Sequence, residues 1–221
     1  MTMSERIPVI EKITKANDEV AAMNLNRLNG KNIFSVNIMA SPGAGKTSLI
    51  EKTLPLLSQE LRLGVIEGDL ATDLDAARTA AAGAISVQIT TGSCHMDAPM
   101  VKQGLDELPL DDLDVIIVEN VGNLICPAGW DLGTHRKVLI ASVPEGDDKP
   151  FKYPRMYRGV DVLVINKIDL LPHVTFDMDR FRTGVEALNE GVITFPTSCT
   201  TGEGLEAWVE WIMKSTGEMK H

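Results

Sequence analysis

The sequence predicts an α/β fold: a mostly parallel sheet of seven strands with helices on both faces, preceded by an N-terminal helix. Short apolar or β-branched runs alternate with longer segments in which apolar residues recur at helical spacing. This alternation is typical of parallel sheets, because each crossover helix returns the chain to the same end of the sheet. The motifs that carry chemistry directly follow predicted strands, where ligands bind in such sheets.

The first 30 residues are expected to form a helical extension, and residues 31–221 the main domain. Residues 4–28 carry apolar side chains at helical spacing, and Gly30 is suited to end that helix. We expect the helix to pack either on the main domain or on a partner. The predicted strands are 33–39, 63–66, 84–90, 115–118, 138–143, 162–165 and 192–195, and the predicted helices of the main domain are 46–61, 73–81, 97–107, 178–189 and 204–215.

Composition and charge argue against several classes of protein. The 221 residues are enough for one well-buried domain, and 44% of them are hydrophobic, as in ordinary soluble proteins. A net charge of −10 argues against a nucleic-acid partner, which requires a basic face. No apolar run approaches the roughly 20 residues of a membrane span, and residues 1–17 lack the apolar core of a secretion signal. We expect a cytoplasmic protein without nucleic-acid or membrane partners, whose three cysteines form no disulfide framework.

A phosphate-binding loop follows the first predicted strand. Residues 40–47 read Ala-Ser-Pro-Gly-Ala-Gly-Lys-Thr and stand between a strand and a helix, the context that identifies a P-loop. The glycines let backbone N–H groups approach phosphate oxygens, Lys46 reaches the β- and γ-phosphates, and the Thr47 hydroxyl is placed for Mg²⁺. Ala40 replaces the usual first glycine, and the alternative is a surface turn that only resembles the motif. The predicted phosphate-binding residues are Pro42, Gly43, Ala44, Gly45, Lys46, Thr47 and Ser48.

Acidic side chains near the ends of two later strands are candidate Mg²⁺ partners, together with Thr47. Asp69 closes the second predicted strand, Asp75 follows it, and Glu119 closes the strand over 115–118. Asp69 can alternatively position the attacking water, and Asp75 can instead cap a helix. Gly122 can offer its backbone N–H to the γ-phosphate, so the segment after it is expected to respond to hydrolysis. The predicted catalytic residues are Lys46, Asp69 and Gly122.

A base-reading motif follows the strand over 162–165. It reads Asn166-Lys167-Ile168-Asp169, and a carboxylate at position 169 can accept two hydrogen bonds from guanine that adenine does not offer. Lys167 can lie along the base, and Asn166 can brace the loop. A backbone N–H near Ser198 and Cys199 can meet the guanine oxygen. The motif predicts GTP as the nucleotide; the alternatives are a capped loop and an ATP-using enzyme.

Three soft ligands follow other predicted strands. Cys94 and His95 are adjacent, and Cys126 lies four residues after Gly122. Thiolate and imidazole groups suit Zn²⁺ and Ni²⁺. Because Gly122 and Cys126 share one short segment, contact with the γ-phosphate could change the metal geometry. The alternative is two buried cysteines and a loop histidine without a metal.

These stretches together resemble the HypB family, the GTPases used in nickel insertion during hydrogenase maturation. The resemblance covers roughly residues 33–215, and ENVGNLICPA at 119–128 is its most distinctive string. It implies the SIMIBI-type branch of P-loop GTPases, in which two copies pair face to face across bound nucleotide. It also implies that Cys94, His95 and Cys126 bind Ni²⁺ or Zn²⁺, and that Lys149 reaches the guanine of the partner copy.

The resemblance implies a GTP-hydrolysing metallochaperone that couples nucleotide-dependent homodimerisation to metal binding. Its implied partners are a second copy, a HypA-like nickel chaperone and the hydrogenase large-subunit precursor; its cofactors are GTP or GDP, Mg²⁺, and Ni²⁺ or Zn²⁺. The first 30 residues lack the cysteine motif and the histidine-rich stretch of some members, so nickel transfer rather than storage is expected.

Two other functions stay open at this point. One is a UreG-like nickel GTPase for urease, and the other is a nucleotide-gated metal-binding dimer in which hydrolysis is secondary. No obvious arginine finger or glutamine follows Gly122. Unassisted hydrolysis is therefore expected to be slow, at roughly 10⁻⁴ to 10⁻² s⁻¹.

Overall fold

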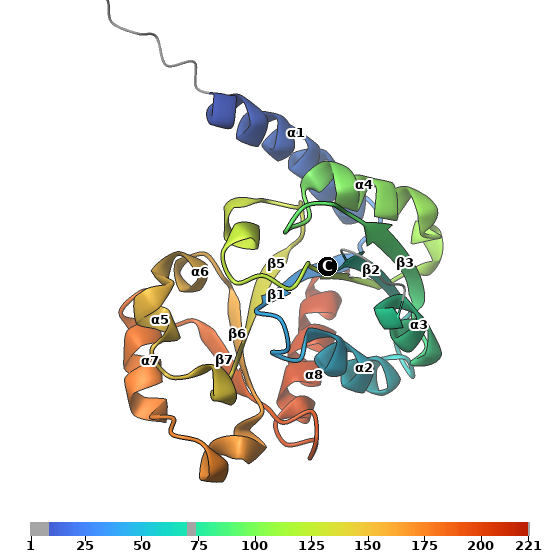
Figure 1. Cartoon of the computed structure of the whole chain (residues 1–221). Coiled ribbons are helices and arrows are strands. Elements are labelled where there is room, and N and C mark those ends of the chain that lie inside the picture. Colours follow the sequence, from blue (N-terminus) through green and yellow to red (C-terminus); the bar gives the residue numbers. More distant parts are fainter. Residues whose placement is uncertain (1–8, 70–73, 221) are drawn as a thin grey trace, which may run out of the picture.

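The computed structural model of the protein describes residues 9–69 and 74–220, with side chains described over 14–69 and 78–220. Within these residues the chain forms one sheet of seven strands in the order β3-β2-β4-β1-β5-β6-β7 (Figure 1). Every neighbouring pair of strands is parallel. The predicted fold class, with its mostly parallel seven-stranded sheet and N-terminal helix, is confirmed.

The strands begin and end close to the predicted positions. Their bounds are β1 Phe34–Ala40, β2 Leu63–Asp69, β3 Ile85–Thr90, β4 Val115–Glu119, β5 Arg136–Ser142, β6 Val162–Asn166 and β7 Ile193–Pro196. The main helices are α1 Val9–Asn29, α2 Lys46–Leu57, α3 Leu74–Ala81, α4 Ala98–Glu107, α5 Lys149–Lys152, α6 Pro154–Arg158, α7 Met178–Glu186 and α8 Leu205–Glu218. Short 3₁₀ turns occupy Leu110–Asp112, Cys126–Gly129, Val143–Glu145 and Ile168–His173.

Two predictions about helices were incomplete. The α2 helix ends at Leu57 rather than at 61, because the chain enters a turn at Ser58. The α5 and α6 helices were not predicted, since four and five residues are too few to show a helical period. No helix among the described residues is long and apolar enough to cross a membrane.

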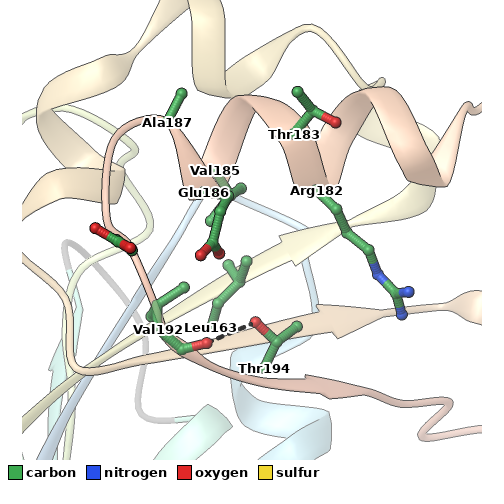
Figure 2. A pocket seen from close by; sticks show the side chains of 9 residues that line it. Leu163, Arg182, Thr183, Val185, Glu186, Ala187, Val192 and Thr194 are labelled. Atoms are coloured by element: carbon green, nitrogen blue, oxygen red, sulfur yellow. Dashed lines mark hydrogen bonds between the residues drawn. The ribbon is translucent and has the colours of Figure 1, made fainter.

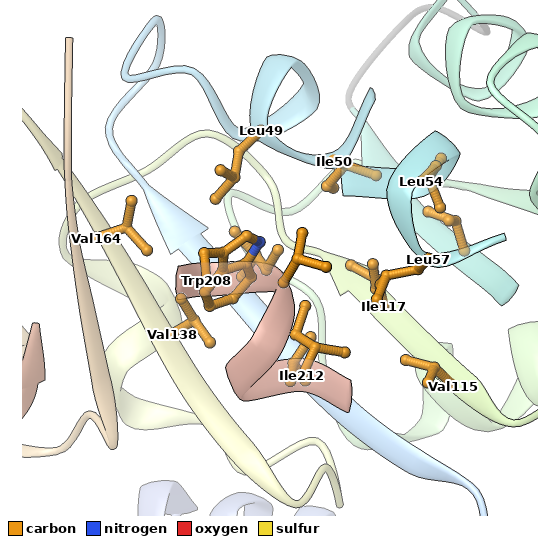
Figure 3. Close-up of a cluster of buried hydrophobic side chains, with 14 of the residues drawn as sticks. Leu49, Ile50, Leu54, Leu57, Val115, Ile117, Val138, Val164, Trp208 and Ile212 are labelled. Atoms are coloured by element: carbon orange, nitrogen blue, oxygen red, sulfur yellow. The ribbon is translucent and has the colours of Figure 1, made fainter. Parts of the chain in front are cut away.

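The strands bury side chains on both faces of the sheet. On β4, Val115 and Ile117 belong to one apolar layer and Ile116 to the opposite layer. The first layer lies under α2 and α8, with Trp208 among the leucines and isoleucines of α2 (Figure 3). Trp208 is fully buried, and its indole N–H donates to Thr53 Oγ1 at 2.9 Å. This contact fixes α8 on the helix that follows the phosphate loop.

The opposite face has two apolar layers. Beneath α1 and α4, Leu28, Val101 and Leu105 pack on the strands β2 and β4. Beneath α6 and α7, Tyr157 and Phe181 pack on β5 and β6. The sheet is thus covered by helices on both faces. The carboxyl ends of its strands lie between these two helical layers. Asp69, Glu119 and Asn166 all close strands there, beside the loop that leaves β1.

Candidate nucleotide and metal site

The loop after β1 is shaped to receive phosphate groups. Gly43 and Gly45 have φ angles of 75° and 105°, a region in which side chains are strained, so glycine is required at both positions. The α2 helix then starts at Lys46 and directs its N-terminus at the loop. A cavity of about 280 Å³ lies here, lined by Gly43, Gly45, Lys46, Thr47, Ser48, Arg78, Glu119 and Lys167. Three predicted motifs of the sequence, the phosphate loop, the segment of Glu119 and the base-reading motif, therefore line one cavity.

The base-reading motif braces the phosphate loop directly. Asn166 Nδ2 donates to the Ala44 carbonyl at 2.9 Å, and Lys167 Nζ donates to the Gly43 carbonyl at 2.7 Å. A Cβ on Gly45 would lie 2.3 Å from Asn166 Nδ2, so the two segments are in close contact. Lys167 itself adopts a left-handed conformation with φ 63°, a strain of the kind found at ligand sites. Residues separated by more than 120 positions are thus brought together as the sequence predicted.

Asp169 is oriented by a residue of the second predicted base-contacting segment. The Ser198 hydroxyl donates to Asp169 Oδ1 at 2.6 Å, and Ser198 is fully buried. The Cys199 thiol donates to Asn166 Oδ1 at 3.4 Å, and burial raises the pKa of this thiol. A fixed carboxylate beside the phosphate loop is suited to two hydrogen-bond donors on one edge of a base.

Buried polar groups meet where Mg²⁺ is expected. The Thr47 hydroxyl donates to Glu119 Oε1 at 2.8 Å, and Lys46 Nζ lies 3.9 Å from the same oxygen. Gly122 lies against this group, because a Cβ there would be 3.4 Å from Lys46 Nζ. Asp69 ends the neighbouring strand β2, two residues beyond the register partner of Glu119. A hydroxyl with carboxylates is the donor set that Mg²⁺ prefers; the side chain of Asp75 lies outside the described residues.

Arg78 lines the phosphate cavity and was not predicted. It stands on α3, and its guanidinium binds Glu51 of α2 through contacts of 2.8 and 2.6 Å. No local pattern indicated this role, since an isolated arginine in a helix is usually a solvated residue. Its cationic group is suited to phosphate oxygens.

The three soft ligands converge. Ligand atoms of Cys94, His95 and Cys126 all lie within 4.8 Å of one another, and Cys94 Sγ is 3.8 Å from His95 Nδ1. Two sulfur ligands of one tetrahedral Zn²⁺ ion lie about 3.8 Å apart, so side-chain adjustments of about 1 Å suffice to close the site. The residues therefore fit a divalent metal held by two thiolates and an imidazole. Cys94 is exposed, which leaves the cluster open on one side.

The surroundings of the cluster orient its side chains and shift their protonation. The Trp130 indole stacks on the His95 ring with centroids 4.6 Å apart. Burial lowers the pKa of His95 against an opposing effect of Asp97, which favours the neutral, metal-binding imidazole. A hydrogen bond with Cys94 and burial raise the pKa of Cys126, which acts against its thiolate form while no metal is bound. Asn123 Nδ2 donates to Cys126 Sγ at 3.3 Å and so holds that sulfur in place.

Two asparagines connect the metal cluster to the phosphate cavity. Asn123 follows Gly122, and its Oδ1 accepts the Cys126 N–H at 3.3 Å. Asn120 follows Glu119 and is 1% exposed; its Oδ1 accepts the N–H groups of Met96 and Val121, both at 3.0 Å. The segment with Cys94 and His95 and the segment with Cys126 are therefore both hydrogen-bonded to the residues that directly follow β4.

Two other features lie apart from this site. Lys149 starts α5, and its ammonium sits 5.5 Å from the centroid of the Tyr153 ring. A cavity of about 750 Å³ between α7 and the strands β6 and β7 is open and lined by mixed side chains (Figure 2). It shares no lining residue with the phosphate cavity, so it is not the nucleotide site despite its greater volume.

Known proteins are similar to this chain. The family model described as "CobW/HypB/UreG, nucleotide-binding domain" matches residues 34–196. A hydrogenase maturation factor HypB from Azotobacter vinelandii is 44% identical over 220 residues, which cover 98% of this chain and 72% of that protein. The chain belongs to the CobW/HypB/UreG family. The region matched by the family model runs from β1 to β7 and contains the phosphate loop, the base-reading motif and the cysteine–histidine cluster.

Other members of the family match along nearly their whole length. A probable hydrogenase maturation factor HypB from Methanocaldococcus jannaschii is 38% identical, with 97% of each chain covered. The crystal structure of HypB from Helicobacter pylori in complex with nickel superposes with a TM-score of 0.88 at 34% identity, covering 92% of this chain and 96% of that one. The chain is thus similar to HypB proteins in both sequence and fold.

Proposed function

We propose that this protein is a GTP-hydrolysing metallochaperone of hydrogenase maturation, which couples nucleotide-dependent pairing of two copies to binding and delivery of Ni²⁺. The observation that carries the proposal is the short segment between Gly122 and Cys126. Gly122 lies against Lys46 in the phosphate cavity, and Asn123 holds Cys126 in the metal cluster. A movement of Gly122 when the γ-phosphate leaves would therefore be transmitted through this five-residue segment to Cys126.

The relatives support nickel as the cargo. The curated proteins that match nearly the whole chain are named as hydrogenase maturation factors, and one similar structure was solved with nickel. The chemistry agrees, because Cys94, His95 and Cys126 supply two thiolates and an imidazole, which Ni²⁺ and Zn²⁺ both accept. An open cluster with three ligands from one chain suits transfer, since a further ligand can come from a partner.

Hydrolysis would proceed at the phosphate cavity. Lys46 and the backbone N–H groups of the loop would hold the phosphates, and Gly122 would contact the γ-phosphate until it leaves. Thr47, Asp69, Asp75 and Glu119 would hold Mg²⁺, which neutralises charge on the phosphates. Arg78 adds a cation to the cavity wall. We expect slow turnover without a partner, at roughly 10⁻⁴ to 10⁻² s⁻¹.

Three partners complete the proposal. A second copy would pair across the nucleotide, with Lys149 reaching the base bound by that copy. A HypA-like nickel chaperone would exchange metal with the cluster, and the hydrogenase large-subunit precursor would receive it. The exposed position of Cys94 is suited to such exchange, because a buried ligand could not meet a partner's ligand.

The identity of the nucleotide tests the base-reading part of this proposal. Replacing Asp169 with Asn (Asp169→Asn) removes the acceptor for two guanine donors, so GTP affinity should fall by roughly 100-fold or more. The matched control is Asp179→Asn, an exposed acidic residue on α7. Affinities are measured by competition among GTP, XTP and ATP for a labelled nucleotide. Unchanged guanine preference in Asp169→Asn, or a wild type that prefers ATP, contradicts the proposal.

A further inference from the structure

The packing face of α1 carries two asparagines where apolar residues are usual. Over residues 14–29 the buried positions are Asn17, Ala21, Asn24 and Leu28, which lie on one side of the helix. Asn17 is 4% exposed and Asn24 is 2% exposed. Burial of a carboxamide is unfavourable unless its hydrogen bonds are satisfied. The groups that these two side chains bind therefore explain their presence.

Both asparagines bind the backbone of the same two segments. Asn17 Oδ1 accepts the Ala98 N–H at 2.8 Å, and Asn17 Nδ2 donates to the Asp131 carbonyl at 2.8 Å. Asn24 Nδ2 donates to the Ala98 carbonyl at 2.9 Å and to the Leu132 carbonyl at 3.0 Å. The residue Ala98 is held at its N–H and at its carbonyl, and each asparagine bridges it to residues 131–132.

These two segments carry the metal ligands. Ala98 begins α4 and lies three residues after His95, while Asp131 directly follows Trp130 in the segment that starts with Cys126. Trp130 stacks on His95, so the segments touch beside the cluster as well as at α1. The separation of Cys94 and His95 from Cys126 is therefore set at two places, by the ring stack and by α1.

The helix approaches the second segment closely. Gly133 has a φ of 77°, and a Cβ on it would lie 2.1 Å from the Ala21 carbonyl oxygen. The backbone of α1 thus rests directly on residue 133, between the two asparagines along the helix face. Such an approach leaves little freedom for residues 131–133 to shift relative to α1.

We propose that α1 is a clamp for the metal cluster, with Asn17 and Asn24 as positioning residues that hold the two ligand-bearing segments at the separation the ion needs. Neither side chain touches the ion; each acts through the backbone at residues 98 and 131–132. This inference rests on the proposed metal site and adds a role for a helix that precedes the region matched by the family model. Groups that hydrogen-bond directly to metal ligands commonly change metal affinity by about 10- to 100-fold, and we expect these contacts through the backbone to act at the lower end of that range.

The test compares Asn17→Ala/Asn24→Ala with the wild-type full-length protein. Ni²⁺ and Zn²⁺ dissociation constants are measured by competition with a chromophoric chelator at fixed pH, together with the absorption band from nickel–thiolate charge transfer. We expect affinity to fall roughly tenfold or more, with a changed charge-transfer band and unchanged GDP affinity. Should the double variant not fold, each single variant carries the test, with a loss of about threefold or more expected for each.

The chain offers a matched control for stability alone. Asn189 Nδ2 donates to the carbonyls of Tyr157 and Val160 at 2.9 and 2.7 Å, a bridge like that of Asn24 but beside α7. Asn189→Ala should lower the melting temperature and leave metal affinity and the charge-transfer band unchanged. Equal metal binding by wild type and the folded asparagine variants overturns the clamp. A wild type that binds no metal overturns the proposed metal site instead.

Discussion

At the residue scale, the site is held by side chains that bind backbone. Asn166 and Lys167 fix the carbonyls of the phosphate loop, and Asn120 fixes the N–H after His95. A carboxamide offers both a donor and an acceptor, so one residue can join two segments. The motif residues were predictable from sequence because their spacing follows the strands. Arg78 was not, since only the packed α3 shows that it lines the cavity.

Arg78 gives a first test at this scale. Replacing it with alanine (Arg78→Ala) removes a cation from the cavity wall, so GTP hydrolysis should slow by about tenfold or more. The rate is measured as phosphate release under single-turnover conditions. Arg62→Ala is the control, because Arg62 also forms a surface ion pair, with Asp114 at 3.2 Å, but lies away from the cavity. Equal rates in both variants would remove Arg78 from the site.

His135 gives a second test, in the pH dependence of stability. The Ser35 N–H donates to His135 Nδ1 at 3.1 Å, so Nδ1 carries no proton, and Nε2 donates to Asn29 Oδ1 at 3.0 Å. Burial lowers the pKa of His135, and the nearby positive charge of Arg136 lowers it further. The unfolded chain takes up the proton first, so stability from this residue is present above about pH 6.5 and declines as the pH falls below it.

The variant His135→Gln isolates that contribution. It lacks the titrating ring, so its free energy of unfolding should fall less steeply than that of the wild type between about pH 7 and 5. Urea denaturation at a series of pH values measures both curves. His173→Gln, an exchange on the exposed 3₁₀ turn after the base-reading motif, serves as the control. Parallel curves for the wild type and His135→Gln would show that this histidine contributes nothing to the pH dependence.

At the scale of elements, apolar periodicity identified the strands and long helices but not how they meet. Every strand was found near its predicted place. The inner strands are largely buried on both faces and read as short apolar runs, and the half-exposed edge strands β3 and β7 are short and rich in β-branched residues. The contacts of α1 could not be predicted, because no local feature of the sequence indicates that an asparagine will bind a carbonyl more than 100 residues away. The same holds for Trp130 and His95, which meet only through the folded chain.

Gly133 tests the seating of α1. Gly133→Ala combines strain at a φ of 77° with a clash against the Ala21 carbonyl, so it should destabilise the protein by about 2–4 kcal/mol. Gly83→Ala is the matched control: its φ of 103° is also strained, but a Cβ there meets nothing within 4 Å. Strain alone should cost about 1–2 kcal/mol. The free energies of unfolding of both variants are measured by urea titration. An equal loss of stability in the two variants would contradict the close contact of α1 with Gly133.

At the scale of the whole molecule, both candidate ligand sites lie at the carboxyl ends of the strands. The strands are all parallel, so their carboxyl ends bring the phosphate loop, the base-reading motif and the metal cluster to the same edge. The β4 strand connects them, because Glu119 faces the phosphate loop and the following residues lead to Cys126. Under the proposed function, nucleotide state and metal binding are coupled through this segment.

Coupling predicts that size and metal content change together. Sedimentation and metal analysis are run on the same full-length sample, with excess Ni²⁺ removed by dialysis, once with GDP and once with a non-hydrolysable GTP analogue. We expect monomer with GDP, dimer with the analogue, and a different amount of bound nickel per chain in the two states. Identical size and identical nickel content in both states would contradict the account.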